Sequence, residues 1–213
     1  FSYVNNNPLK YTDPSGHCRK DDEACWSYLR WIQNEYEVTV HVDDDLPWDM
    51  DKLSVLDGSL LDIRRFFGND RQSAQRWFKN AVGRVEYRLQ RIIDDSTLGY
   101  SGVPKDDPGL IRVYITGLAW LKGYNIAKTT IIHETGHAIE NNHQRQGQAR
   151  LERTFGGNRI LGVCVPGICQ QAESVSLYAT DSWPEEFAET FTALIVSLEH
   201  GNPALVDPSY NIN

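Results

Sequence analysis

The run His133-Glu134-Thr135-Gly136-His137 has the residue types and the spacing that bind a metal ion and activate water. Residues four apart lie on one face of a helix, so His133 and His137 can present two imidazole nitrogens to one ion, for which zinc (Zn²⁺) is our first expectation. Glu134 stands next to the first of these ligands. There it can take a proton from a water molecule whose pKa the metal lowers towards neutrality.

The residues around this motif predict a helix with one buried face. Residues 129–132 form a short apolar lead-in, and Ile132, Gly136 and Ile139 recur at the i, i+4, i+7 spacing of an apolar stripe. Gly136 is about 1 kcal/mol less favourable than alanine inside a helix, which indicates that another segment packs closely there. The polar run 141–144 ends the helix.

A hydrolytic zinc site needs a third protein ligand and leaves the fourth position to water. Downstream, Pro184 suits the first turn of a helix and Ser182 suits its cap, so Glu185 and Glu189 would share one helix face. One carboxylate could bind the metal while the other accepts an N–H from a ligating histidine. The opposite face is apolar, and we expect it to enter the core through Phe187, Phe191 and Leu194.

The pattern H-E-x-G-H, followed about forty residues later by Y-x-x-x-x-x-x-E-x-F-A-E-x-F, resembles the catalytic domain of anthrax lethal factor and its relatives. These relatives include the Pro-Pro endopeptidases, and all are gluzincin metallopeptidases. The resemblance covers residues 129–195 and implies three zinc ligands, which are His133, His137 and Glu185. It implies Glu134 as the general base, Tyr178 as the phenol that stabilises the transition state, and Glu189 behind a ligating histidine. Glu186 stands where the family has an apolar residue, so an exchange of roles between Glu185 and Glu186 is an alternative.

Residues 1–16, FSYVNNNPLKYTDPSG, are rich in turn formers and resemble the end of the core of Rhs (YD-repeat) proteins. In that family this segment precedes a variable C-terminal toxin domain. The resemblance implies that residues 1–16 are the end of an Rhs core and that residues 17–213 are a toxin domain delivered into a target cell. It also implies two partners besides the substrate, the Rhs shell before release and a cognate immunity protein.

Composition and charge exclude some classes of partner. The 213 residues include 21 basic and 29 acidic side chains, a formal net charge of −8, which argues against a nucleic-acid partner. No apolar run reaches the length of about 18 residues needed for a transmembrane helix.

The four cysteines form two local pairs, Cys18 with Cys25 and Cys164 with Cys169. An even number permits three disulfide connectivities, while a zinc site and free thiols remain alternatives. Cys18 is also a conceivable fourth metal ligand that blocks water.

The remaining pattern predicts helices over residues 25–36, 50–67 and 71–93, strands over 37–42 and 110–116, and loops over 94–108 and 147–172. We expect residues 17–109 to be mainly helical scaffold and residues 110–213 to be the catalytic part. The expected fold is α+β and zincin-like, with a small sheet, the motif helix and a C-terminal helix that carries the third ligand. The strand at 110–116 is expected to be the sheet edge that lines the cleft and pairs with an extended substrate.

These features together predict a zinc metalloendopeptidase that hydrolyses a protein or peptide in a target cell. One alternative is a hydrolase that cleaves an amide bond other than a peptide bond. A second is a non-catalytic binding module whose metal is structural or absent.

Overall fold

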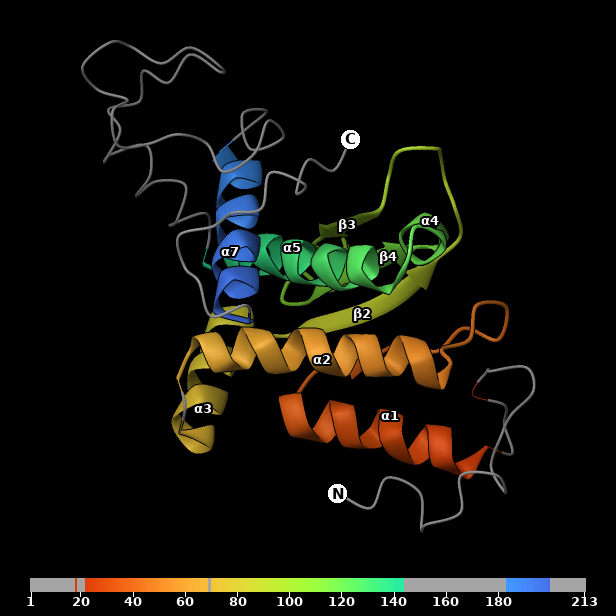
Figure 1. Cartoon of the computed structure of the whole chain (residues 1–213), viewed down its shortest axis with the longest axis horizontal. Coiled ribbons are helices and arrows are strands. Elements are labelled where there is room, and N and C mark those ends of the chain that lie inside the picture. The colour runs from red at the N-terminus through yellow and green to blue at the C-terminus, as the bar shows by residue number, and fades with distance from the viewer. Residues whose placement is uncertain (1–17, 19–21, 69, 144–182, 200–213) are drawn as a thin grey trace.

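The H-E-x-x-H motif lies in α5 (Tyr124–Asn142), the helix around which the other elements are arranged (Figure 1). The structure, a computed structural model, describes residues 18, 22–68, 70–143 and 183–199. Those residues form six helices and a four-stranded sheet, in agreement with the predicted combination of helices and a small sheet. None of the helices in this part of the chain has the length and apolar character needed to cross a membrane.

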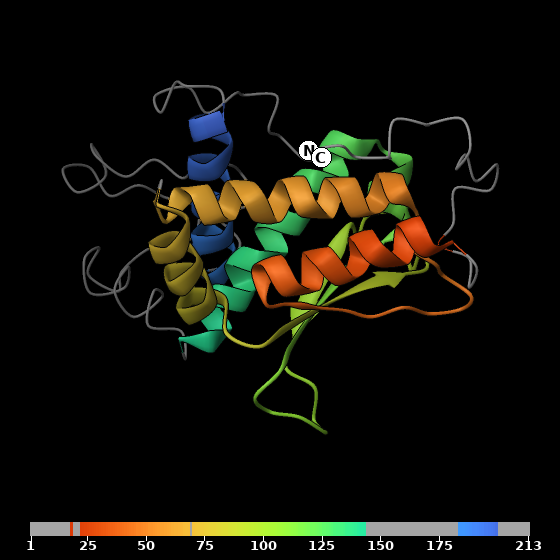
Figure 2. The same ribbon diagram turned by 90° about the horizontal axis from the view of Figure 1, so that it is seen from below.

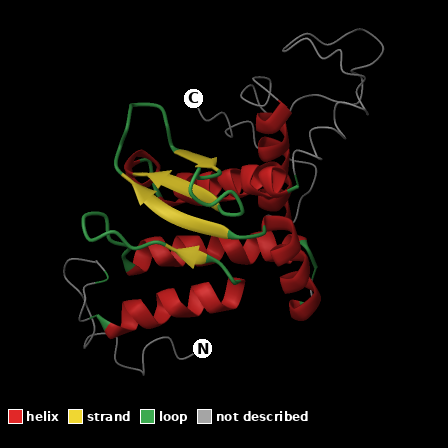
Figure 3. Ribbon diagram, turned by 180° about the vertical axis from the view of Figure 1, so that it is seen from behind, coloured by secondary structure: helices red, strands yellow, loops and turns green. Residues whose placement is uncertain are grey.

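The sheet has the strand order β1 (Thr39–Val40), β2 (Val85–Gln90), β4 (Ile111–Thr116) and β3 (Gly99–Gly102). The first three strands are parallel, whereas β3 is antiparallel to β4 and forms an edge. One face of the sheet packs on α5, where the Tyr87 hydroxyl lies 2.9 Å from Thr135 Oγ1. Seen from behind, the sheet lies in front of α5 (Figure 3).

The N-terminal helices α1 (Glu23–Tyr36), α2 (Met50–Phe66) and α3 (Arg71–Val82) support α5 from the other side. Each begins after an aspartate whose side chain accepts a backbone N–H of the first turn; these caps are Asp22, Asp49 and Asp70. α2 contacts α5, and α1 packs on α2 (Figures 1 and 2). The predictions of helices over 25–36 and 50–67 are therefore confirmed.

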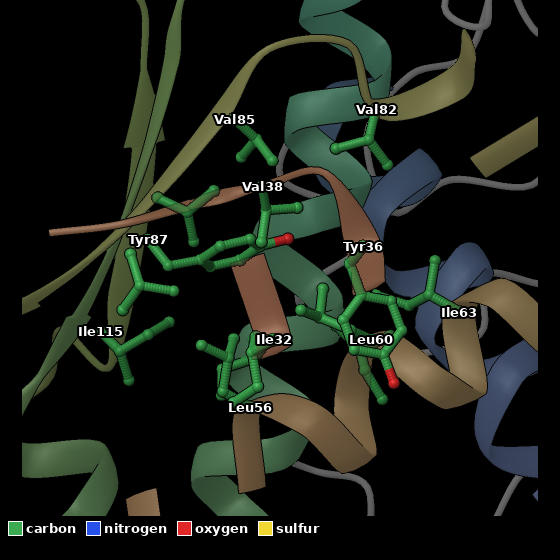
Figure 4. Packing of buried hydrophobic residues seen from close by; sticks show 14 of the residues in the cluster. Ile32, Tyr36, Val38, Leu56, Leu60, Ile63, Val82, Val85, Tyr87 and Ile115 are labelled. Carbon is green, nitrogen blue, oxygen red and sulfur yellow. The ribbon is translucent and has the colours of Figure 1, made fainter. Parts of the chain in front are cut away.

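Apolar side chains from the helices and the sheet meet in one core (Figure 4). Ile32 of α1, Leu56 of α2, and Tyr87 and Ile115 of the sheet are fully buried there. The motif helix is enclosed between the sheet and these helices, so it is buried on nearly all sides and not on a single face as predicted. The burial of α5 depends on the elements packed around it, and the periodicity of the helix sequence alone does not show how many there are.

The prediction of one helix over residues 71–93 is wrong. Helix α3 ends at Gly83, which has a φ of 71°, and β2 begins two residues later. Glycine adopts a positive φ without the cost of a Cβ atom, so the chain can turn here from helix to strand. Val85, Tyr87 and Leu89 show the alternation of a strand.

The edge strand is also not the predicted one. Residues 111–116 form a strand, β4, but it is hydrogen-bonded on both sides, to β2 and to β3. The edge next to α5 is β3, which lies within the predicted loop 94–108. Its sequence Gly-Tyr-Ser-Gly is too short and too rich in glycine to show a strand pattern.

Cys18 and Cys25 form a disulfide that ties the chain before α1 to the first turn of that helix. The Cys18 backbone N–H also donates to the Trp48 carbonyl at 2.7 Å. Cys18 as a fourth metal ligand is therefore wrong, because its sulfur is bonded to Cys25. Cys164, Cys169 and the predicted loop 147–172 lie outside the described residues, as do residues 1–16.

The last described helix, α7 (Trp183–Glu199), packs against α5 at Gly136. A Cβ atom on Gly136 would lie 3.1 Å from Ala188 Cα and 3.2 Å from Phe191 Cδ1, which confirms the predicted close approach. Leu194 was expected in the core but is 43% exposed. The buried residues of α7 all lie within about 100° of Thr192 on the helix, whereas Leu194 points about 160° away from it.

We expect Gly136→Ala to lower the free energy of unfolding by about 1–3 kcal/mol, because the added methyl group overpacks the contact with Ala188. The matched control is Gly58→Ala in α2, where a Cβ atom would meet nothing within 4 Å. That variant should gain about 0.5–1 kcal/mol from helix propensity. Urea unfolding measures both, and equal stabilisation by the two variants would contradict the close packing of α5 on α7.

Candidate metal centre

Helix α5 places the two motif histidines on one face, as the spacing predicts. The Nε2 atoms of His133 and His137 lie 3.1 Å apart. His133 is 8% exposed and His137 is half-buried, so both rings are largely removed from water. Both histidines therefore direct an imidazole nitrogen at one point beside the helix.

Helix α7 brings a carboxylate to the same point. Glu185 Oε2 lies 3.3 Å from His133 Nε2 and 3.3 Å from His137 Nε2. Three atoms bound to one tetrahedral zinc ion at about 2.0–2.1 Å are about 3.3–3.4 Å from one another. The three donor atoms thus already have the spacing of ligands around a single ion, and the group His133, His137 and Glu185 could hold one.

Glu189 lies one helical turn beyond Glu185 and contacts the far side of a histidine ring. Its Oε1 atom is 2.9 Å from His133 Nδ1, and the residue is only 3% exposed. A carboxylate at this nitrogen fixes the orientation of the ring and leaves Nε2 as the atom that faces the site. Glu189 therefore lies where a carboxylate could orient His133, and its role behind a metal ligand stays a prediction.

The charges of the site favour a cation. Burial alone would lower the pKa of His133, but hydrogen bonds to Glu185 and Glu189 outweigh it and raise that pKa to about 10. Burial would raise the pKa of Glu185, but the two histidines lower it to about 2. Both pKa shifts have one cause, which is the attraction between the carboxylates and the imidazole rings that meet at this point.

Glu134 lies beside these residues on α5 and is 5% exposed. Its Oε2 atom is buried without a hydrogen-bond partner among the described residues. Burial raises the pKa of Glu134, and the neighbouring histidines oppose this effect. A buried carboxylate oxygen without a partner is costly, so it is a natural acceptor for a water molecule or substrate group at the site.

Two of the predicted roles fall outside this description. Tyr178 lies outside the described residues, and the Glu186 side chain is not described. The sequence interpretation missed Gly99 of β3, which lies against the Glu134 side chain. Only the recognition of β3 as a strand could have pointed to this glycine.

No protein-family model, curated protein or solved structure matches this chain. The chemistry of the site therefore stands on its own residues. Two imidazole nitrogens and one carboxylate oxygen are a donor set that could hold a metal ion, and beside it lies a Glu134 oxygen that has no partner among the described residues.

We expect Glu185→Ala to weaken zinc binding by more than about 100-fold, because a direct ligand contributes more than a residue that only orients one. Elemental mass spectrometry on the purified full chain should find about one zinc per wild-type chain, and a competition titration gives the affinity. Glu186→Ala is the matched control and should keep the metal. Zinc lost with Glu186→Ala and kept with Glu185→Ala would reverse the assignment.

We expect Glu189→Gln to weaken zinc binding less, by about 10–100-fold, because His133 loses the carboxylate that fixes its ring. The same competition titration measures this change. Glu186→Gln makes the same chemical change on the same helix and should have no effect. Equal affinities for Glu189→Gln and wild type would show that Glu189 does not support the metal site.

Proposed function

We propose that this chain is a zinc-dependent metallopeptidase of the gluzincin type. The observation that carries the proposal is the triangle of Nε2, Nε2 and Oε2 atoms at 3.1–3.3 Å. Beside it lies a Glu134 carboxylate oxygen that has no hydrogen-bond partner in the described part of the chain. Three protein donors converge among the described residues, and three donors would leave a fourth position for water, as a hydrolytic site requires.

In this mechanism His133, His137 and Glu185 would hold the ion and Glu134 would move the proton. A bound zinc ion would supply Lewis-acid chemistry to the attacking water and the scissile carbonyl. Glu134 accepts a proton from the water as its oxygen attacks the carbonyl carbon, and then donates that proton to the amine as the C–N bond breaks. Glu189 keeps the His133 ring in place during both steps. The resemblance to lethal factor assigns the hydrogen bond to the developing oxyanion to Tyr178.

Strand β3 supports an extended peptide as the substrate. It pairs with β4 on one side and has no strand partner on its other side among the described residues. It also lies against Glu134, since a Cβ atom on Gly99 would be only 2.9 Å from Glu134 Cγ. A peptide that added to this edge would bind through main-chain hydrogen bonds and would run past the general base.

The resemblance of residues 1–16 to the end of an Rhs core supports a biological setting for this activity. The peptidase would be the C-terminal toxin of a larger Rhs protein and would act on a protein inside a target cell. A cognate immunity protein would then protect the producing cell.

We expect Glu134→Gln to reduce peptide hydrolysis by about 10²–10⁴-fold, because the amide cannot accept the proton from water. A library of peptides from a digested proteome, read by mass spectrometry, identifies cleaved sequences, and a fluorogenic peptide of the best sequence gives kcat and KM. Zinc content should stay at the wild-type value. Glu23→Gln, an exposed site on α1, is the control and should retain full activity.

Cleavage that survives Glu134→Gln would overturn this mechanism. A chain that binds zinc and cleaves no peptide in the library would favour the non-catalytic binding module.

A further inference from the structure

Strand β3 is an open edge of the sheet and carries one large side chain. The strand pairs with β4 on one side and has no strand partner on its other side among the described residues. In Figure 1 it is the outermost strand at the top of the sheet. Its residues are Gly99, Tyr100, Ser101 and Gly102. A side chain of β3 that recognises a neighbouring peptide by its bulk must therefore be Tyr100.

Tyr100 lies on the face of the sheet that points away from α5. Ser101 is in register with Val113 and, one strand further, with Tyr87. The Tyr87 hydroxyl contacts Thr135 of α5, so this row of residues faces that helix. Side chains alternate along a strand, so Tyr100 points to the opposite face. There it is 37% exposed and can contact a bound molecule.

The Tyr100 ring is held against one neighbour and turns its other face to the open edge. It stacks on Tyr114, its partner on β4, with 4.5 Å between the ring centroids and 14° between the ring planes. Since β4 lies on one side of β3, the stacked face of the Tyr100 ring points to β4. The outer face points to the position of the next strand. A peptide that paired with β3 would place one of its side chains against that face.

The same edge passes the proposed general base. A Cβ atom on Gly99, the residue before Tyr100, would lie 2.9 Å from Glu134 Cγ. Residues along a strand are about 3.3 Å apart, so we place the peptide residue beside Tyr100 within about two residues of the scissile bond. Tyr100 can therefore select a side chain close to the point of cleavage, on the sheet face opposite the metal ligands.

We propose that Tyr100 is a specificity-determining residue, which selects extended peptides that carry an aromatic side chain close to the scissile bond. The inference rests on the proposed function, since it needs a peptide that pairs with β3 and is cleaved beside Glu134. Aromatic side chains that are cross-strand neighbours attract each other by stacking in addition to the area they bury. An aromatic ring of the substrate would extend the stack that Tyr114 and Tyr100 form.

We expect a fluorogenic peptide with phenylalanine at the selected position to have a kcat/KM about five to ten times that of the same peptide with alanine there. Scanning each position near the scissile bond of the library-derived sequence identifies the selected one. Tyr100→Ala should bring this ratio to within about twofold of one, because the stacking surface is lost. Tyr100→Phe keeps the ring and should retain the ratio.

Trp77→Ala is the matched control, because it removes another exposed aromatic ring, on α3. It should change neither the ratio nor kcat. Thermal unfolding of each variant checks that the fold is intact.

A wild-type ratio near one at every scanned position, or a ratio that persists in Tyr100→Ala, would overturn the specificity role. Glu134→Gln is measured beside these variants to separate the two hypotheses. Either of those results with an inactive Glu134→Gln rejects this inference alone. An active Glu134→Gln, or a library in which no peptide is cleaved, rejects the proposed function and this inference with it.

Discussion

The close contact between α5 and α7 at Gly136 is the constraint on which the rest of the site depends. Gly136 lies between the two motif histidines, and on α7 it faces Ala188, which lies between Glu185 and Glu189. Two small residues at the crossing let the helices approach until the short side chain of a glutamate reaches both imidazoles. A larger residue at either position would move the carboxylates and histidines apart together. The packing of α5 on α7, the convergence of the three donor atoms and the contact of Glu189 with His133 therefore all depend on this one helix crossing.

Because these side chains are buried, their charges are costly unless each has a partner of opposite charge. His133, Glu134 and Glu189 are all nearly inaccessible to water, and buried charges are stable only when they are paired. Glu189 pairs with the Nδ1 side of His133, while Glu185 meets the Nε2 atoms of both histidines. The raised pKa of His133 and the lowered pKa of Glu185 express the same demand for positive charge. A divalent cation meets that demand at the position where the three donor atoms converge, which supports the proposed zinc site.

Local spacing predicted the parts of the site that depend on one helix at a time. The i, i+4 relations place His133 with His137 and Glu185 with Glu189, and the cost of Gly136 indicated the close helix contact. The predictions that were wrong concern features that depend on tertiary structure. The chain changes from helix α3 to strand β2 at Gly83, whose φ is positive, and β3 is a strand only because it pairs with β4. For the same reason the burial of α5 on nearly all sides and the exposure of Leu194 could not be predicted from periodicity.

The distinction between a structural and a hydrolytic metal site rests on what lies beside the ligands. A structural zinc has four protein ligands and needs no neighbouring base. Here Cys18, the conceivable fourth ligand, is bonded to Cys25, and three donors converge next to a carboxylate whose Oε2 has no partner among the described residues. An unpartnered buried oxygen lowers stability, so a sequence that needed only a folded scaffold would gain by replacing Glu134 with an apolar residue. Under the proposed function Glu134 would be the general base beside the three donors, and the edge of β3, which lies against it at Gly99, would align a peptide with it.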